Sequence, residues 1–329
     1  MQETRRDRVY ICEVVARDGF QNEAVFVETA DKIALIDALS TTGVAKIEAT
    51  AFVSPKAVPN MRDAAQVMAG IRRAPGVVYS ALVPNLRGAS AALQAGADEL
   101  NLVFSASDSH NLANVRMTSA ESLRAFEEIF ALARAQDKPI AVTIATSFGC
   151  PFEGPVDARR VLDFYRRCLA MGASAMALAD TTGMGNPAQV ERLVASALAI
   201  SPDTPLGLHF HNTRGMGMAN ALAAWQAGAR RFDAALGGIG GCPFAPGATG
   251  NICTEDTVHM FEEMGVPTGV DLPALMALSR RLPGLLGHET PGQVAKAGRS
   301  GDLHEAPVRV RAQQSDLAPQ AADAGGNPN

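Results

Sequence analysis

Residues 140–180 read IAVTIATSFGCPFEGPVDARRVLDFYRRCLAMGASAMALAD, and this stretch decides the fold. It begins with the apolar run IAVTIAT (140–146) and ends with AMALA (175–179), and both runs are typical of buried strands. Between them, residues 158–171 carry apolar side chains at spacings of three and four, which predicts a helix. A strand, a helix and a second strand in this order predict parallel strands joined by a right-handed crossover.

The same alternation continues on both sides of this stretch. The predicted strands are residues 9–15, 46–51, 77–82, 99–104, 140–146, 175–179, 206–210 and 231–235. The predicted helices include residues 29–41, 60–73, 119–135, 158–171, 187–199 and 217–227. Local signals support their ends, because Thr118 and Glu121 have the spacing of a capping box, and Gly43, Gly172 and Gly228 stand where helices should stop.

Eight strand and helix units predict an α/β protein, a (β/α)8 TIM barrel with helices around a closed parallel sheet. A doubly wound open sheet is the competing architecture. It usually carries a glycine-rich nucleotide-binding turn after its first strand, whereas this chain has Arg17-Asp18-Gly19-Phe20 there. The barrel is therefore the favoured fold.

The composition is that of a globular protein of 329 residues, with 47% hydrophobic residues, 34 acidic and 29 basic side chains and a net charge of −5. A single core of this size is unusual outside a barrel. We expect one catalytic barrel over residues 1–298, including a C-terminal helical segment, and a disordered tail over residues 299–329. The acidic balance, without any basic block, argues against nucleic-acid binding.

The sequence also has none of the features that direct a chain to membranes or out of the cell. No stretch approaches the roughly 18 apolar residues of a membrane-spanning helix, and the charged residues 1–8 do not resemble a secretory signal. The five cysteines are scattered without paired spacing, which indicates free thiols in a reducing compartment. We therefore expect a cytoplasmic protein without membrane contacts, and we expect it to self-associate.

Active sites of such barrels lie at the carboxyl ends of the strands, and polar residues of this chain collect there. Arg17 and Asp18 follow the first predicted strand, Glu48 lies in the second, Asn85 follows the third, Asp180 closes the sixth, and His209 and His211 end the seventh. Any one of them could be a turn or capping residue. Their convergence predicts a functional site.

The sequence His209-Phe210-His211 is the sharpest local feature. Alternate residues of a strand point to the same face, roughly 7 Å apart, so both imidazoles can face one ion. The spacing alone equally fits two hydrogen-bonded polar residues. Asp18 and Asn251 could add oxygen ligands, because barrel closure makes the seventh, eighth and first strands neighbours. Two nitrogens and two oxygens suit Mg²⁺ or Mn²⁺, although the imidazoles would also tolerate Zn²⁺, Fe²⁺ or Co²⁺.

Residues 237–251 read GGIGGCPFAPGATGN, a glycine-rich loop with Cys242 near its centre. Such a loop can approach a ligand closely or move as a lid, and a flexible surface loop is the alternative. A thiol above a metal site is well placed for proton transfer once water is excluded.

Taken in chain order, these motifs resemble the 3-hydroxy-3-methylglutaryl-CoA lyases, a family of metal-dependent barrel lyases related to acyl-CoA condensing enzymes. The matching strings are RDGFQNE (17–23), IEATAFVSPKAVPNM (47–61), GCPFEGPV (149–156), ADTTGMGNP (179–187), HFHNTRGMGMAN (209–220) and GGIGGCPFAPGATGNICTED (237–256). The resemblance implies retro-aldol cleavage of a hydroxyacyl-CoA to acetyl-CoA and a keto acid, with Mg²⁺ or Mn²⁺.

Residue roles follow from the same resemblance. The implied metal ligands are Asp18, His209, His211 and Asn251. Arg17 would stabilise negative charge on the thioester oxygen, Cys242 would transfer a proton, and Glu48 and Asp180 would complete the catalytic network. The expected substrate-binding residues are Gln21, Ala51, Thr143, Thr181 and Arg214.

Three of these substrate-binding positions depart from the family pattern. Ala51 stands in place of a serine, Thr143 in place of a tyrosine on the fifth strand, and Arg214 in place of another tyrosine. We expect the reaction to be kept and the substrate to be a related 3-hydroxyacyl-CoA, with another C3 substituent or a carboxylate that pairs with Arg214. Alternatively, these positions vary without consequence.

Two other functions remain compatible with the residues. One is a Claisen-type enzyme that condenses acetyl-CoA with a 2-keto acid, since that related group carries Arg-Asp and His-x-His on the same fold. The other is a barrel that binds a metal or an acyl-CoA without catalysis. The Cys242 loop favours the lyase.

Overall fold

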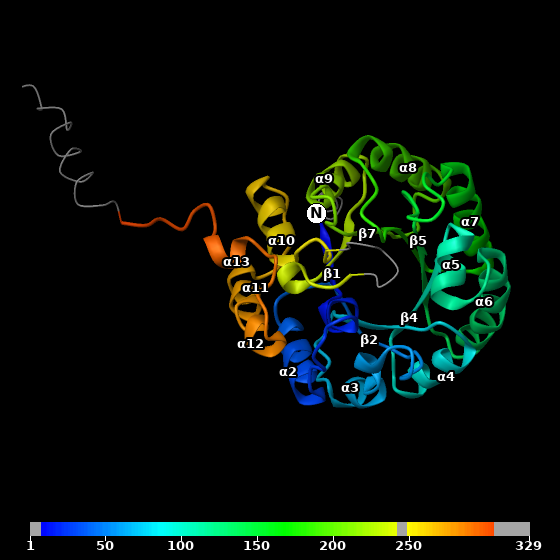
Figure 1. Cartoon of the computed structure of the whole chain (residues 1–329), viewed down its shortest axis with the longest axis horizontal. Coiled ribbons are helices and arrows are strands. Elements are labelled where there is room, and N and C mark those ends of the chain that lie inside the picture. The colour runs from blue at the N-terminus through cyan, green and yellow to red at the C-terminus, as the bar shows by residue number, and fades with distance from the viewer. Residues whose placement is uncertain (1–7, 242–248, 306–329) are drawn as a thin grey trace, which may run out of the picture. The chain divides into compact units, whose positions relative to one another are not determined.

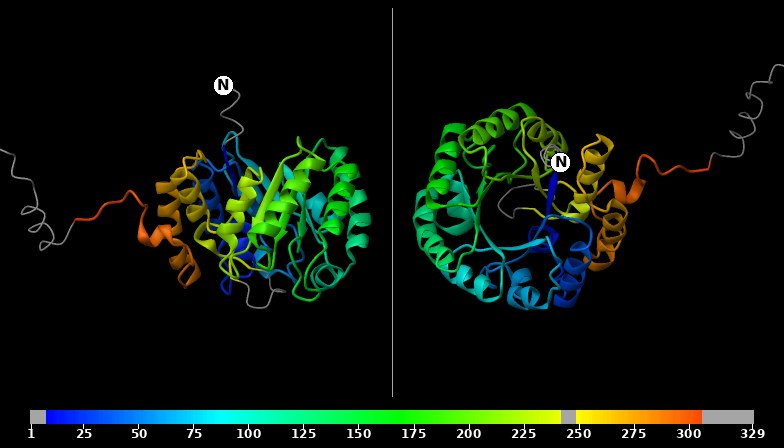
Figure 2. Two further views of the ribbon diagram at one scale, coloured as in Figure 1. Left: turned by 90° about the horizontal axis from the view of Figure 1, so that it is seen from above. Right: turned by 180° about the vertical axis from the view of Figure 1, so that it is seen from behind.

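A computed structural model describes residues 8–241 and 249–305 of the chain. Eight parallel strands form a closed barrel in the order β1 to β8, and β1 pairs with β8 to complete it. Helices form a ring outside the strands (Figures 1 and 2). The predicted (β/α)8 barrel is confirmed.

All the predicted strands are present, with ends that shift by at most two residues. They are β1 (Tyr10–Glu13), β2 (Lys46–Ala51), β3 (Val78–Leu82), β4 (Glu99–Ser105), β5 (Ile140–Ala145), β6 (Ala175–Asp180), β7 (Leu206–Phe210) and β8 (Arg231–Ala234). Every residue of β5 is buried, because the barrel interior covers one face of this strand and the helices cover the other.

The predicted helices also form, and further helices lie between and after them. The helices are α2 (Thr29–Leu39), α3 (Ala64–Gly70), α4 (Leu86–Gln94), α5 (Asp108–Val115), α6 (Ser119–Arg134), α7 (Ala158–Met171), α8 (Pro187–Ile200), α9 (Gly217–Gln226), α10 (Thr254–Glu263), α11 (Leu272–Ser279), α12 (Leu282–Leu286) and α13 (Val294–Ala297). Thr118 and Glu121 form the predicted capping box of α6, and Gly172 ends α7 with a φ of 104°.

The helix predicted over residues 60–73 is shorter than expected. A 3₁₀ turn, η2 (Pro59–Met61), precedes it, and α3 begins only at Ala64. Asp63, at the N-cap position, makes no capping bond, because its carboxylate accepts hydrogen bonds from Lys32 and Thr29 of α2 instead. A tertiary contact has therefore replaced the local capping signal.

The core between strands and helices is packed by aromatic side chains. Phe104 of β4 meets Phe126 of α6 and Phe164 of α7 edge to face, with ring centroids 5.9 and 5.3 Å apart. Burying each such ring contributes roughly 1.5–3 kcal/mol. This packing fixes the helices against the barrel, so that the loops at the strand ends start from a rigid base.

Helix α2 is tied to α3 by a buried ion pair that supports a stability prediction. The Lys32 ammonium donates to the Asp63 carboxylate at 2.8 and 3.0 Å and to the Asn60 carbonyl at 2.6 Å. Asp63→Ala is expected to cost about 3–5 kcal/mol of unfolding free energy, because it leaves a buried ammonium without its counter-ion. Guanidinium chloride unfolding measures this loss.

Asp31→Ala is the matched control, since Asp31 lies exposed in the first turn of the same helix. Its loss should be below about 1 kcal/mol. An equal loss of unfolding free energy in the two variants would contradict the predicted stabilisation by the Lys32–Asp63 ion pair.

The chain divides into two compact units, Met1–Lys296 and Ala297–Asn329. The tail boundary expected after residue 298, and the expected disorder of residues 299–329, stay predictions because residues 306–329 lie outside the described part. Among the described residues, no helix is both long enough and apolar enough to cross a membrane.

Candidate active site

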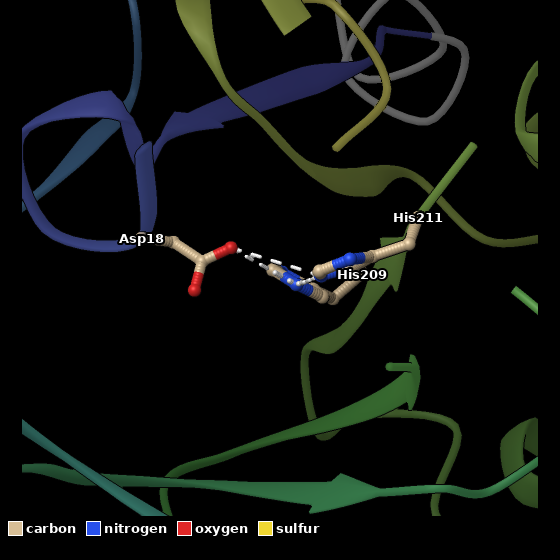
Figure 3. Close-up of side chains that lie close together, drawn as sticks. All are labelled: Asp18, His209 and His211. Atoms are coloured by element: carbon tan, nitrogen blue, oxygen red, sulfur yellow. Dashed lines mark hydrogen bonds and ion pairs between the residues drawn. The ribbon is translucent and has the colours of Figure 1, made fainter. Parts of the chain in front are cut away.

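Three side chains meet at the carboxyl ends of the strands in an arrangement suited to a metal ion. His209 lies in β7, His211 follows that strand, and Asp18 lies in η1 (Val15–Gly19), the turn of π-helix after β1. Their ligand atoms lie within 4.8 Å of one another (Figure 3). His209 Nε2 is 3.0 Å from His211 Nε2, and Asp18 Oδ2 is 3.8 and 3.7 Å from these two nitrogens.

The strand geometry explains how the two imidazoles come together. His209 and His211 point to the same side of the chain, while the ring of Phe210 is fully buried and lies 5.9 Å from that of Phe148. Burial and the neighbouring His209 lower the pKa of His211 to about 4, so His211 is neutral at pH 7. A neutral imidazole is the form that binds metals.

Asn251 lies beside this group and offers the predicted fourth ligand atom. Its Nδ2 donates to Asp18 Oδ2 at 2.7 Å and to the Ile239 carbonyl at 3.0 Å. Its Oδ1 is buried and has no hydrogen-bond partner among the residues that the structure describes. A buried carbonyl oxygen without a partner, next to a carboxylate and two imidazoles, fits the donor set of a divalent cation.

The backbone of η1 presents Arg17 and Asp18 to the site. The amides of Arg17 and Asp18 both donate to the Val14 carbonyl, at 3.2 and 2.7 Å. Glu13, the last residue of β1, supports this turn, because its Oε1 accepts hydrogen bonds from the amides of Val15 and Leu236 at 2.8 and 3.0 Å. A π-helical turn inside a protein commonly marks a functional site.

Arg17 is buried between two carboxylates. Its Nη1 donates to Asp18 Oδ1 at 2.5 Å and its Nε donates to Glu48 Oε2. Burial alone would raise the pKa of Asp18, but the charge of Arg17 holds that pKa well below its usual range. Asp18 is therefore ionised at neutral pH, as a metal ligand must be.

The structure also places the other predicted catalytic residues. Glu48 Oε1 accepts a hydrogen bond from Asn101 Nδ2 at 2.6 Å. Asp180 accepts the amides of Met184 and Gly185 at 2.9 and 3.0 Å, so it shapes the loop after β6, and burial raises its pKa. Cys242 lies outside the described residues, and its catalytic role stays a prediction.

The predicted substrate-binding residues do not all gather at one place. Thr143 donates to Asn101 Oδ1 at 3.0 Å and so joins the network around Glu48, while Ala51 is buried at the end of β2. Thr181 Oγ1 accepts the amide of Thr146, and Gln21 is half-buried just after η1.

Arg214 is exposed, and one nitrogen of its guanidinium, Nη1, is bound by the protein. It donates to the carbonyls of Thr182 and Gly183 at 2.9 and 3.0 Å. In this structure it holds the loop after β6, and its expected pairing with a substrate carboxylate stays a prediction.

Two residues of the site were not foreseen. Asn101 of β4 joins Glu48 to Thr143, and Asp233 of β8 lies 3.2 Å from His209 Nδ1. Each is a polar residue inside a predicted apolar strand. This departure from the strand pattern is the sequence feature that could have identified them.

The fold is a closed (β/α)8 barrel, and a buried aspartate and two histidines lie together at its strand ends. This combination is typical of barrel enzymes that use a metal ion. A family model described as HMGL-like matches residues 8–282, and the chain belongs to this family. The 3-hydroxy-3-methylglutaryl-CoA lyase family expected from the motifs is thereby confirmed.

Individual relatives agree with this assignment. An (R)-citramalyl-CoA lyase of Chloroflexus aurantiacus is 46% identical over 89% of this chain and 95% of its own. A hydroxymethylglutaryl-CoA lyase of Bacillus subtilis is 42% identical over 87% of this chain and 96% of its own. The structure of an HMG-CoA lyase from Acinetobacter baumannii, in complex with coenzyme A and 3-methylmalate, is 56% identical, covers 92% of this chain and 99% of that one, and superposes with a TM-score of 0.89.

These relatives are all lyases, which answers the question left open between a lyase, a condensing enzyme and a binding protein. The protein is a carbon–carbon lyase with hydroxymethylglutaryl-CoA lyase-like function.

Proposed function

We propose that the protein uses Mg²⁺ or Mn²⁺ to cleave the coenzyme A thioester of a 3-hydroxy acid related to 3-hydroxy-3-methylglutarate, releasing acetyl-CoA and a keto acid. The observation that carries this proposal is the buried group of Asp18, His209 and His211 with the Arg17 guanidinium beside it. Asn251 is the fourth proposed ligand.

The substrate assignment has support from two directions. The relatives include one named for (R)-citramalyl-CoA and others named for hydroxymethylglutaryl-CoA, and both compounds carry a tertiary hydroxyl at C3 of a coenzyme A thioester. Ala51 and Thr143 replace a serine and a tyrosine of the family pattern, so two residues expected to bind substrate have changed. We therefore propose that the preferred substrate is an analogue with another C3 substituent, such as citramalyl-CoA.

The chain's own residues have separate tasks in this reaction. A bound divalent ion would supply Lewis-acid polarisation of the substrate oxygens. Arg17 places a permanent positive charge where negative charge develops on the thioester oxygen as the carbon–carbon bond breaks. Glu48 holds the Arg17 Nε, so the guanidinium need not reorganise during the reaction. Cys242 then donates a proton to the enolate carbon of acetyl-CoA, and the proton lost by the substrate hydroxyl restores the thiol. This role rests on the resemblance of its loop to the family.

Incubation of EDTA-treated protein with Mg²⁺ or Mn²⁺ and each thioester tests the proposal. We expect no acetyl-CoA without added metal, and a kcat/KM for (R)-citramalyl-CoA at least about tenfold above that for 3-hydroxy-3-methylglutaryl-CoA, since one methylene in a fitted pocket is worth about 10–200-fold. Chromatographic detection of acetyl-CoA measures both results.

Equal or faster cleavage of 3-hydroxy-3-methylglutaryl-CoA would contradict the substrate assignment and leave the reaction intact. Activity unaffected by EDTA would contradict the metal requirement. Release of free coenzyme A from acetyl-CoA plus a keto acid would support the condensing enzyme instead. A cytoplasmic location and self-association are further expectations, which fractionation and light scattering would test.

A further inference from the structure

A cavity of about 290 Å³ opens at the amino-terminal end of the barrel, on the opposite side from the strand ends that carry Asp18, His209 and His211, here called the metal group. The first residues of the strands line it, including Cys12, Lys46, Glu99 and Arg231. Glu48, Asn101 and Asp233 also line it, so the cavity reaches the network beneath the candidate metal site.

The cavity is polar enough to hold water. Lys46 and Glu99 form an ion pair at its wall, and Ser80 Oγ is buried without a hydrogen-bond partner among the described residues. A cavity of this size that opens to solvent and has polar side chains in its wall is normally hydrated, whereas an enclosed apolar one stays empty.

Asp233 connects this cavity to the metal group. It stands directly opposite His209 in the β7–β8 ladder, and its Oδ2 lies 3.2 Å from His209 Nδ1. Its side chain keeps 20% of its surface exposed. A carboxylate oxygen accepts hydrogen bonds, so in this contact a neutral His209 carries its proton on Nδ1 and donates it to Asp233.

The position of this proton decides what the other ring nitrogen can do. With the proton on Nδ1, His209 Nε2 has a free lone pair, and Nε2 is the atom that faces His211 and Asp18. A carboxylate that holds a metal-binding histidine in this way also fixes the orientation of its ring.

We infer that Asp233 is a positioning residue, which sets the tautomer and the ring orientation of His209 through the contact between its Oδ2 and His209 Nδ1. The inference rests on the metal site of the proposed function. It concerns metal binding through His209 and gives Asp233 no contact with substrate.

Asp233→Asn tests the inference. The asparagine amide can donate to His209 Nδ1 and so favour the tautomer with its proton on Nε2, which cannot bind a metal. We expect the dissociation constant for Mn²⁺, measured by isothermal titration calorimetry on the full chain, to rise about 10–100-fold. Nitrogen-15 NMR of the histidine side chains in metal-free protein should show Nδ1–H for His209 in the unmodified chain and a shift toward Nε2–H in the variant.

Glu99→Gln is the matched control, because it makes the same carboxylate-to-amide change in the same cavity, on a residue whose ion pair is with Lys46. Its Mn²⁺ affinity should change less than threefold. An Nε2–H tautomer of His209 in the unmodified protein, or equal Mn²⁺ affinities for Asp233→Asn and the unmodified protein, would overturn the inference. Absence of Mn²⁺ binding by the unmodified protein would instead overturn the metal site of the proposed function.

Discussion

His209→Ala is expected to abolish Mn²⁺ binding at micromolar concentrations and to lower kcat/KM by on the order of 10³-fold or more. His209 supplies one of two nitrogens in the group with Asp18 and His211, and its Nε2 lies 3.8 Å from Asp18 Oδ2 and 3.0 Å from His211 Nε2. Removing the ring leaves a buried carboxylate, one imidazole and the neutral Asn251 carbonyl, too few strong ligands to hold the ion against water. Calorimetric titration with Mn²⁺ and an acetyl-CoA assay measure the two losses.

His304→Ala is the control for this experiment. His304 is exposed and belongs to the unit Ala297–Asn329, so its loss removes an imidazole without changing the barrel. Its metal affinity and turnover should match those of the unmodified protein. A His209→Ala variant that keeps its Mn²⁺ affinity would contradict the assignment of the metal site.

Arg17→Lys is expected to lower kcat by about 10²–10³-fold while Mn²⁺ affinity falls less than tenfold. The substitution keeps the positive charge and loses the planar fork that reaches Asp18 through Nη1 and Glu48 through Nε. A lysine ammonium cannot hold both carboxylates and face the thioester oxygen in the same geometry. Steady-state kinetics at saturating Mn²⁺ separate this effect from metal loss.

Arg72→Lys provides the comparison for Arg17→Lys, because Arg72 is exposed and pairs with Asp37, and neither residue belongs to the group of Asp18, His209 and His211. It should leave kcat unchanged. If Arg17→Lys kept full kcat, the stabilising role of Arg17 would be wrong; a parallel loss of Mn²⁺ binding would show instead that Arg17 acts by keeping Asp18 ionised.

Much of the fold was predictable because its signals are local. Each strand is a short apolar run, and the helix over Ala158–Met171 has the bounds that its periodicity predicts. The helix over residues 60–73 was predicted too long, because Asp63 turns to Lys32 and leaves its own helix uncapped. Sequence periodicity does not report which distant side chain will compete for a capping residue.

The meeting of Asp18, His209 and His211 was predictable for a related reason. His209 and His211 are two residues apart in a strand, so their common direction follows from strand geometry. Asp18 was placed near them because β1 must pair with β8 once the barrel closes. Asp233 was missed, because its role depends on its register opposite His209, and register is a property of the assembled sheet.

The sequence by itself determined the eight-fold alternation, the histidine pair and the family motifs, since all three are patterns of neighbouring residues. Only the tertiary structure decided how these residues act on one another. Asp18 and Asn251 lie 233 positions apart in the chain, yet a 2.7 Å hydrogen bond joins them. Electrostatic and hydrogen-bond energies depend on such distances and on burial, and barrel closure is what sets both.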